Sequence, residues 1–144
     1  MLDKNESLKL DNQLCFPLYT ASRLVIQAYQ PMLKELDITY PQYLVLLVLW
    51  EKDAVNLSTV AEKLQLKSNT LTPLLKRLEK RGLLERKRSE IDERNIVITL
   101  TKEGKKLKDK ACEIPSLLAS KVPLSAEETQ QFSRLLGKLI GEIN

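Results

Sequence analysis

The pattern of apolar and polar residues along the chain predicts a mainly helical protein. From about residue 11 to residue 36 apolar residues recur at helical spacing, and Asp11 or Asn12 could cap the start of this first helix. The segment from Pro41 to about Lys52 is almost wholly apolar, which is typical of a helix at the centre of a fold.

Two shorter helices and two strands are predicted next. Asn56 or Ser58 could cap a helix that ends near Leu64, and Ser68 could cap another that ends at Gly82. The period then changes, because residues 83–89 and 95–100 are rich in β-branched residues and read as strands. The charged residues 90–94 between them predict an exposed hairpin tip. Helix, helix, strand and strand in this order predict a winged helix-turn-helix, whose wing reaches an adjacent minor groove.

The remaining helix signals are local. Thr39 with Gln42 and Ser125 with Glu128 each form a possible capping box. Thr101 should open a helix that bends or ends around Pro115. The last helix carries a long apolar stripe, which we expect to pack against the first helix and against a second copy of the chain. The stripe consists of Phe132, Leu135, Leu136, Leu139, Ile140 and Ile143.

The helix that begins near Ser68 has two distinct faces. Leucines occupy one face at positions 71, 74, 75 and 78. Small polar groups can bind base edges and cations can bind phosphates, so the opposite face suits a DNA major groove. That opposite face carries Asn69, Thr72, Pro73, Lys76, Arg77 and Lys80.

The charge distribution points the same way. Residues 67–88 contain eight basic and two acidic residues, a net charge of +6 in a chain whose total is +4. Such a basic patch is the electrostatic footprint of nucleic-acid binding, although a solvated helix face is the alternative interpretation of a charge run.

Composition excludes several classes of protein. A length of 144 residues predicts one domain, and the absence of histidine excludes histidine-based catalysis and histidine-containing zinc sites. Only two cysteines are present, so we expect no metal and no cofactor. The polar start is no signal peptide, and no apolar run approaches the length of a membrane span, which predicts a cytoplasmic protein without a membrane partner.

Cys15 is the candidate reactive group. We expect it about four residues into the first helix, where the helix dipole favours a thiolate. Tyr29 shares its helix face, but 14 residues correspond to about 21 Å along the axis, so contact requires an antiparallel pairing of two first helices. The alternative is that Cys15 and Cys112 are both buried, inert side chains.

Four segments resemble a known family. They are LDNQLCFPLY (Leu10–Tyr19), LDITYPQYLVLLVLWE (Leu36–Glu51), TLTPLLKRLEKRGLLERKRS (Thr70–Ser89) and DERNIVITLTKEG (Asp92–Gly104). With them the chain resembles the organic-hydroperoxide resistance regulators, OhrR, within the MarR superfamily of winged-helix repressors. The resemblance covers nearly the whole chain from about residue 8. It implies one domain over residues 1–144, in which residues 11–36 and 102–144 dimerise and residues 41–100 form the DNA-binding lobe.

The resemblance also implies roles for single residues. Cys15 matches the cysteine that peroxide oxidises, Tyr29 and Tyr40 match tyrosines that hydrogen-bond it from the other subunit, and Tyr19 matches a nearby pocket tyrosine. The helix over residues 68–81 matches the recognition helix, and Asp92 and Arg94 match the wing-tip pair. The DNA contacts expected from the recognition helix and the wing are Lys67, Ser68, Asn69, Thr70, Thr72, Lys76, Arg77, Lys80, Arg86, Arg88, Asp92 and Arg94.

Two positions depart from the family pattern. Lys67 stands where an acidic residue is expected, and Cys112 does not fall where two-cysteine members carry their resolving cysteine, nearer Ser120. A mixed disulfide between Cys15 and a low-molecular-weight thiol is therefore the better expectation than a bond to Cys112.

These observations predict a homodimeric repressor that binds a pseudo-palindromic double-stranded operator and releases it when an organic hydroperoxide oxidises Cys15. Two other functions stay open. A thiol peroxidase would turn peroxide over, yet the chain has no βαβ pattern and its basic helix and wing would be unexplained. A MarR-type repressor released by a non-oxidative small ligand would leave Cys15 merely buried.

Overall fold

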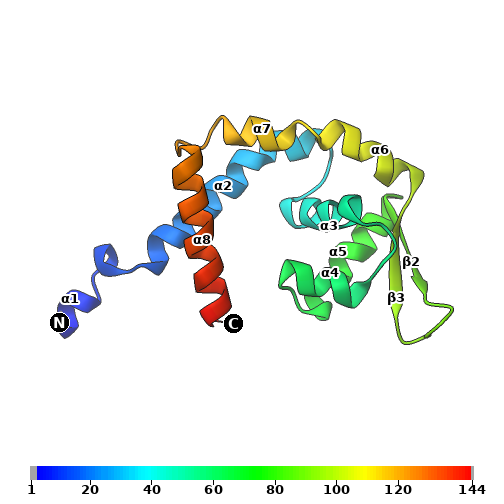
Figure 1. Cartoon of the computed structure of the whole chain (residues 1–144), viewed down its shortest axis with the longest axis horizontal. Coiled ribbons are helices and arrows are strands. Elements are labelled where there is room, and N and C mark those ends of the chain that lie inside the picture. Colours follow the sequence, from blue (N-terminus) through cyan, green and yellow to red (C-terminus); the bar gives the residue numbers. More distant parts are fainter. Residues whose placement is uncertain (1–2, 144) are drawn as a thin grey trace. The chain divides into compact units, whose positions relative to one another are not determined.

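The computed structural model describes residues 3–143 and is mainly helical, with one small antiparallel sheet (Figure 1). This confirms the predicted fold class. The chain forms two compact units, residues 1–114 and residues 115–144. In chain order the elements are α1 (Lys4–Ser7), the 3-10 helix η1 (Leu10–Asn12), α2 (Cys15–Glu35), α3 (Tyr40–Glu51), β1 (Val55–Asn56), α4 (Leu57–Leu64), α5 (Ser68–Lys80), β2 (Leu84–Arg88), β3 (Ile96–Leu100), α6 (Lys102–Ala111), α7 (Ile114–Ala119) and α8 (Ala126–Ile143).

Helix α2 begins later than the sequence predicts. Asp11 and Asn12 lie in η1, and the Asn12 amide donates to the Glu6 carbonyl oxygen at 2.7 Å, so neither residue caps α2. Cys15 is consequently the first residue of the helix and not about the fourth. Two short helical segments, α1 and η1, precede α2.

Helix α3 forms the centre of the larger unit. The predicted capping box is present, since the Thr39 backbone N–H donates to Gln42 Oε1 at 2.9 Å and the Gln42 N–H donates to Thr39 Oγ1 at 3.4 Å. The helix packs against α2, α4, α5 and α6, which explains why it is apolar on nearly every side. Its buried side chains include Tyr43, Val45, Leu46 and Leu49.

Helices α4 and α5 form the helix-turn-helix. Asn56 and Lys67 precede them at the N-cap positions, and Ser58 and Ser68 lie inside the helices, so the predicted serine caps are wrong. In α5 the predicted leucine face is buried, with Leu71, Leu75 and Leu78 all fully covered and Leu74 partly so.

The end of α5 follows the prediction closely. Gly82 has a φ of +73° and its N–H donates to the Glu79 carbonyl oxygen, while the Leu83 N–H donates to the Leu78 carbonyl oxygen. This is the Schellman arrangement that favours glycine at the first position after a helix. It turns the chain directly into β2.

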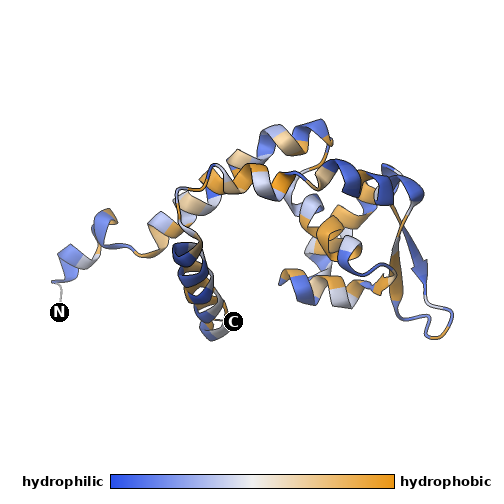
Figure 2. Cartoon of the chain, turned by 45° about the horizontal axis from the view of Figure 1, so that its top comes forward, coloured by the Kyte–Doolittle hydropathy of each residue, from blue (hydrophilic) through white to orange (hydrophobic). Residues whose placement is uncertain are grey.

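Both predicted strands are present, and Figure 2 shows β3 coloured as the hydrophobic strand and β2 as largely hydrophilic. Strand order is β1-β3-β2, with Arg86 opposite Ile98. The third strand, β1, was not predicted, because two residues carry too little periodicity to register as a strand. It closes the sheet edge beside the helix-turn-helix by pairing Val55 with Ile98.

The helix that Thr101 opens ends before Pro115, as expected. Helix α6 ends at Ala111 and α7 begins at Ile114, so the proline lies in the first turn of α7, where it is well tolerated. In the smaller unit the predicted capping box of α8 is present, with the Glu128 N–H donating to Ser125 Oγ at 3.1 Å and the Ser125 N–H donating to Glu128 Oε1 at 3.0 Å. None of the described side chains of α8 is buried in the chain.

Candidate DNA-binding surface and redox site

Helix α5 presents its polar face to solvent. Asn69, Thr70, Lys76 and Lys80 are exposed, as are Lys67 and Ser68 at the start of the helix. Thr72 is half-buried, and its hydroxyl donates to the Ser68 carbonyl oxygen at 2.7 Å. Leucine burial on the other face therefore fixes which side chains of this helix are free for a ligand.

The wing carries a preorganised arginine at its tip. Arg94 donates through its backbone N–H and its Nε to Asp92 Oδ1, at 3.1 and 3.2 Å, and through its Nη2 to Asp92 Oδ2 at 3.3 Å. These side-chain and backbone hydrogen bonds from Arg94 hold the pKa of Asp92 below its ordinary value. The Arg94 side chain remains 90% exposed, so the carboxylate orients the guanidinium without covering it.

Arg86 is engaged inside the lobe. Its backbone N–H donates to Glu79 Oε2 at 2.9 Å and its guanidinium pairs with Glu79 Oε1, so it joins β2 to α5. The backbone hydrogen bond from Arg86 is the largest cause that lowers the pKa of Glu79. Arg88 is exposed and donates to the Glu93 carbonyl oxygen at 3.3 Å, which ties the base of the wing to its tip.

Cys15 is exposed in the chain and so is Cys112, so the interpretation of both as buried side chains does not hold within one chain. Tyr19, one turn after Cys15, is 66% exposed. The Cys112 thiol lies at the C-cap of α6 and donates to the Asp109 carbonyl oxygen at 2.9 Å.

Tyr29 and Tyr40 lie together, away from the start of α2 that carries Cys15. Their ring centroids are 4.9 Å apart, and Tyr43 completes the cluster at 5.8 Å from Tyr29 and 6.3 Å from Tyr40. Burial is the main cause that raises the pKa of all three hydroxyls, which therefore stay protonated at neutral pH. Sequence reasoning missed Tyr43, although its place three residues after Tyr40 on one helix is the signal that could have found it.

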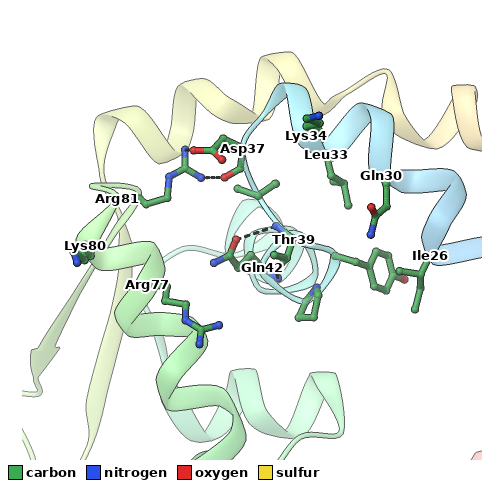
Figure 3. Close-up of a pocket in the computed structure, with 13 residues that line it drawn as sticks. Ile26, Gln30, Leu33, Lys34, Asp37, Thr39, Gln42, Arg77, Lys80 and Arg81 are labelled. Carbon is green, nitrogen blue, oxygen red and sulfur yellow. Dashed lines mark hydrogen bonds and ion pairs between the residues drawn. The ribbon is translucent and has the colours of Figure 1, made fainter. Parts of the chain in front are cut away.

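A cavity of about 630 Å³ adjoins this cluster (Figure 3). Ile26 and Gln30 of α2 and Tyr40 of α3 form one side of it, and Arg77 and Arg81 near the end of α5 form the other.

Arg81 bridges the rim of this cavity. It donates to the Asp37 carbonyl oxygen, and its Nη2 lies 3.5 Å from Asp37 Oδ2. The cavity thus has an apolar and aromatic side and a cationic side, with Lys34 and Lys80 also in its lining.

Two kinds of feature are absent from residues 3–143. None of the helices in this range is long and apolar enough to cross a membrane. The same residues hold no cluster of three cysteine, aspartate or glutamate side chains that could bind a metal ion.

Comparison with known proteins places these features in context. Residues 27–111 match a family model described as the transcriptional regulator SarA/Rot. The chain is 47% identical over 140 residues to the organic hydroperoxide resistance transcriptional regulator of Bacillus subtilis (strain 168), covering 97% of this chain and 95% of that protein.

Solved structures of AbfR, a protein of Staphylococcus epidermidis, are also similar. Reduced AbfR bound to DNA has a TM-score of 0.81 at 41% identity and covers 98% of each chain. Disulfide-formed AbfR has a TM-score of 0.66 at 41% identity, covering 97% of this chain and 96% of that one.

Proposed function

The chain belongs to the SarA/Rot-type transcriptional regulators, among the organic-hydroperoxide resistance regulators of the winged-helix MarR superfamily, and from this premise we propose how it works. As a homodimer in the cytoplasm it binds a pseudo-palindromic operator and releases it when an organic hydroperoxide oxidises Cys15. The observation that carries the proposal is that one chain combines an outward polar α5 face and an Asp92-oriented Arg94 with an exposed thiol at the start of α2.

In the first part of the proposal, residues 41–100 form the lobe that binds double-stranded DNA. Helix α5 enters the major groove and Arg94 enters the adjacent minor groove. In a two-fold dimer the two copies of α5 lie about 34 Å apart, one turn of DNA. With roughly four phosphate contacts per subunit, log K should fall against log salt with a slope near −7.

The wing assignment has its own test. Arg94→Ala should weaken DNA binding more than Lys87→Ala, because Arg94 is held for the minor groove whereas Lys87 is an exposed side chain paired with Glu85 at 3.4 Å. Binding isotherms at several salt concentrations measure both. Equal losses in the two variants would contradict the wing assignment.

The dimerisation part assigns residues 11–36 and 102–144 to subunit contact. Large apolar side chains along α2 and α8 are exposed in the single chain, and Figure 2 shows the orange positions along α2. Solvent exposure of this much apolar surface is unfavourable, so a second copy is its natural cover. The exposed residues include Leu14, Phe16, Leu24 and Val25 of the first part and Phe132, Leu135 and Ile140 of the second.

Cys15 senses the hydroperoxide in a reaction of two steps. The Cys15 thiolate attacks the terminal oxygen of the hydroperoxide, the O–O bond breaks, and the OH group stays on the sulfur as a sulfenic acid. The alkoxide that departs takes up from solvent the proton that the thiol had released, and it leaves as an alcohol. A low-molecular-weight thiol then condenses with the sulfenic acid, which forms a mixed disulfide and releases water. Cys15 thus reacts stoichiometrically as a switch, and the proposal includes no catalytic turnover.

The tyrosines act in this scheme across the dimer. Cys15 and Tyr29 are separated by 14 residues of one helix, or about 21 Å, so contact requires a second copy. Tyr29 and Tyr40 of the partner subunit, kept neutral by burial, donate hydrogen bonds to the Cys15 thiolate, and Tyr19 lines the same pocket. Oxidation removes these hydrogen bonds and adds bulk at Cys15. The two DNA-binding lobes then move, so that their separation no longer matches the spacing of the operator half-sites.

The experiment that tests this function measures DNA affinity of the reduced protein, after one equivalent of an organic hydroperoxide with a small thiol, and after dithiothreitol. We expect tight binding, release, and recovery. Continuous consumption of peroxide with the thiol, without release, would instead identify a thiol peroxidase.

The cavity beside Tyr40 favours a second candidate function. Arg77 lies on its cationic side beside Arg81, which is already paired with Asp37, and the Arg77 guanidinium suits an anionic small ligand that would release DNA without oxidation. Release of Cys15→Ser from DNA by an aromatic carboxylate under reducing conditions would support that function.

A further inference from the structure

The wing tip exposes one large apolar side chain in charged surroundings. Ile91 is 98% exposed, the highest value among the large apolar residues in the part of the chain that the structure describes. Its neighbours from Glu90 to Arg94 are otherwise all charged. Most of the other exposed large apolar residues lie in segments that the proposed dimer would cover. Ile91 instead lies in the loop between β2 and β3, the hairpin that Figure 1 shows.

Hydrogen bonds fix the backbone at this position. Ser89 Oγ accepts from the Ile91 N–H at 3.2 Å and from the Asp92 N–H at 3.4 Å. The Asn95 N–H donates to the Asp92 carbonyl oxygen and the Ser89 N–H donates to the Asn95 carbonyl oxygen. These hydrogen bonds therefore fix the backbone position of Ile91, three residues before the Asp92-bound Arg94.

We propose that Ile91 is a DNA contact, which packs against the sugar walls of the minor groove beside Arg94 and makes the wing sensitive to groove shape. This rests on the proposed DNA-binding function. Apolar side chains, isoleucine among them, enter the minor groove in other DNA-binding proteins. Deoxyribose groups line the walls of this groove, and a guanidinium alone leaves their apolar edges uncovered. Glu90 and Glu93, both exposed, stay outside the groove, since carboxylates are repelled by phosphates.

The contact predicts a specific thermodynamic signature. Partial burial of one isoleucine in each of two wings corresponds to a change in affinity of about tenfold. The apolar contact displaces no counterions, so its loss should leave the salt slope unchanged, whereas loss of a phosphate contact reduces that slope.

The test uses a duplex enriched from a random-sequence pool by the wild-type protein, with affinity measured by fluorescence anisotropy at several salt concentrations. Ile91→Ser should bind about tenfold more weakly at each salt concentration, with the wild-type slope, and Ile91→Val should bind within about twofold of wild type. Glu90→Gln, at the adjacent exposed position, is the matched control and should bind at least as tightly as wild type.

A base substitution checks the groove directly. Changing A·T pairs under the wing to G·C pairs adds the guanine amino group to the minor-groove floor, and inosine·C pairs lack that group. The wild type should lose affinity on G·C and recover it on inosine·C, while Ile91→Ser should respond less. Wild-type affinity in Ile91→Ser would overturn the inference alone and leave the tip free for a protein partner; failure of the wild type to enrich any duplex would overturn the proposed function as well.

Discussion

Gly104 of α6 lies against the backbone of Leu83, directly before β2, and adding a methyl group there should destabilise the DNA-binding lobe strongly. A Cβ built on Gly104 would lie 2.0 Å from the Leu83 carbonyl oxygen and 3.1 Å from a Leu100 side-chain carbon. Real Cβ atoms stay at least 3.0 Å from such an oxygen, so one backbone must move by about 1 Å. The Gly104→Ala variant therefore cannot be accommodated by a side-chain rotation.

The cost follows from the bonds that such a shift disturbs. The Thr101 N–H donates to the Leu83 carbonyl oxygen at 3.1 Å, and the indole Nε1 of Trp50 donates to the Gly104 carbonyl oxygen at 3.0 Å. Overpacking costs about 1–3 kcal/mol and each weakened hydrogen bond about 1 kcal/mol. The free energy of unfolding should fall by about 2–4 kcal/mol, a large part of the roughly 5–15 kcal/mol that a domain has.

The assay is urea denaturation at a fixed protein concentration, followed by far-UV circular dichroism and by the fluorescence of Trp50, the single tryptophan. Glu62→Ala is the control, because Glu62 is exposed inside α4 and outside the proposed dimer contact, so the change should alter the free energy of unfolding by less than about 0.5 kcal/mol. A loss below about 0.5 kcal/mol in Gly104→Ala would refute the reasoning that a close backbone approach fixes the wing to α6.

Three further predictions concern the sensor and the second cysteine. Tyr29→Phe and Tyr40→Phe should each slow alkylation of Cys15 at neutral pH by about tenfold, since a charge-assisted hydrogen bond to the thiolate is lost; wild-type rates in both would reduce the tyrosines to packing. Cys112→Ser should leave peroxide-induced DNA release intact when a small thiol is supplied, and a Cys15–Cys112 bond on a non-reducing gel would argue the reverse. Burial raises the pKa of Tyr29, Tyr40 and Tyr43 above 10.0. The stability that these neutral hydroxyls contribute is therefore complete below pH 10 and is lost as the pH rises through their pKa values in the folded state. Urea denaturation from pH 8 to 11 should show that the free energy of unfolding falls less with pH in Tyr43→Phe than in the wild type.

The parts of the fold that local sequence determines were predictable. The capping box at Thr39 joins residues three apart in the sequence. The left-handed conformation of Gly82 was also predictable, because the leucine face of α5 stops just before a glycine. The start of α2 was not predictable, because Asn12 bonds back to the Glu6 carbonyl oxygen instead of capping the helix. The sequence alone does not show whether the Asn12 side chain bonds to the preceding Glu6 carbonyl oxygen or caps the N–H groups of the helix that follows.

Tertiary contacts account for the rest of the differences. Arg86 and Lys87 look alike in the basic run, yet the fold pairs Arg86 with Glu79 across α5 and β2 and leaves Lys87 exposed. The spacing of Tyr40 and Tyr43 places both on one face of α3, but the packing of α3 against α2 is what brings them to Tyr29. The proposed contact of Tyr29 and Tyr40 with Cys15 joins two subunits. The pattern of residues in one chain does not show such a contact, and the family resemblance is what implies it.

The central claim is that Cys15 oxidation controls DNA binding. The most direct measurement compares operator affinity of the wild type and Cys15→Ser, each with and without an organic hydroperoxide in the presence of a small thiol. We expect both reduced proteins to bind alike, the oxidised wild type to lose the operator, and Cys15→Ser to stay bound. Release of Cys15→Ser by hydroperoxide, or retention of DNA by a wild type whose Cys15 is fully oxidised by mass spectrometry, would contradict the account.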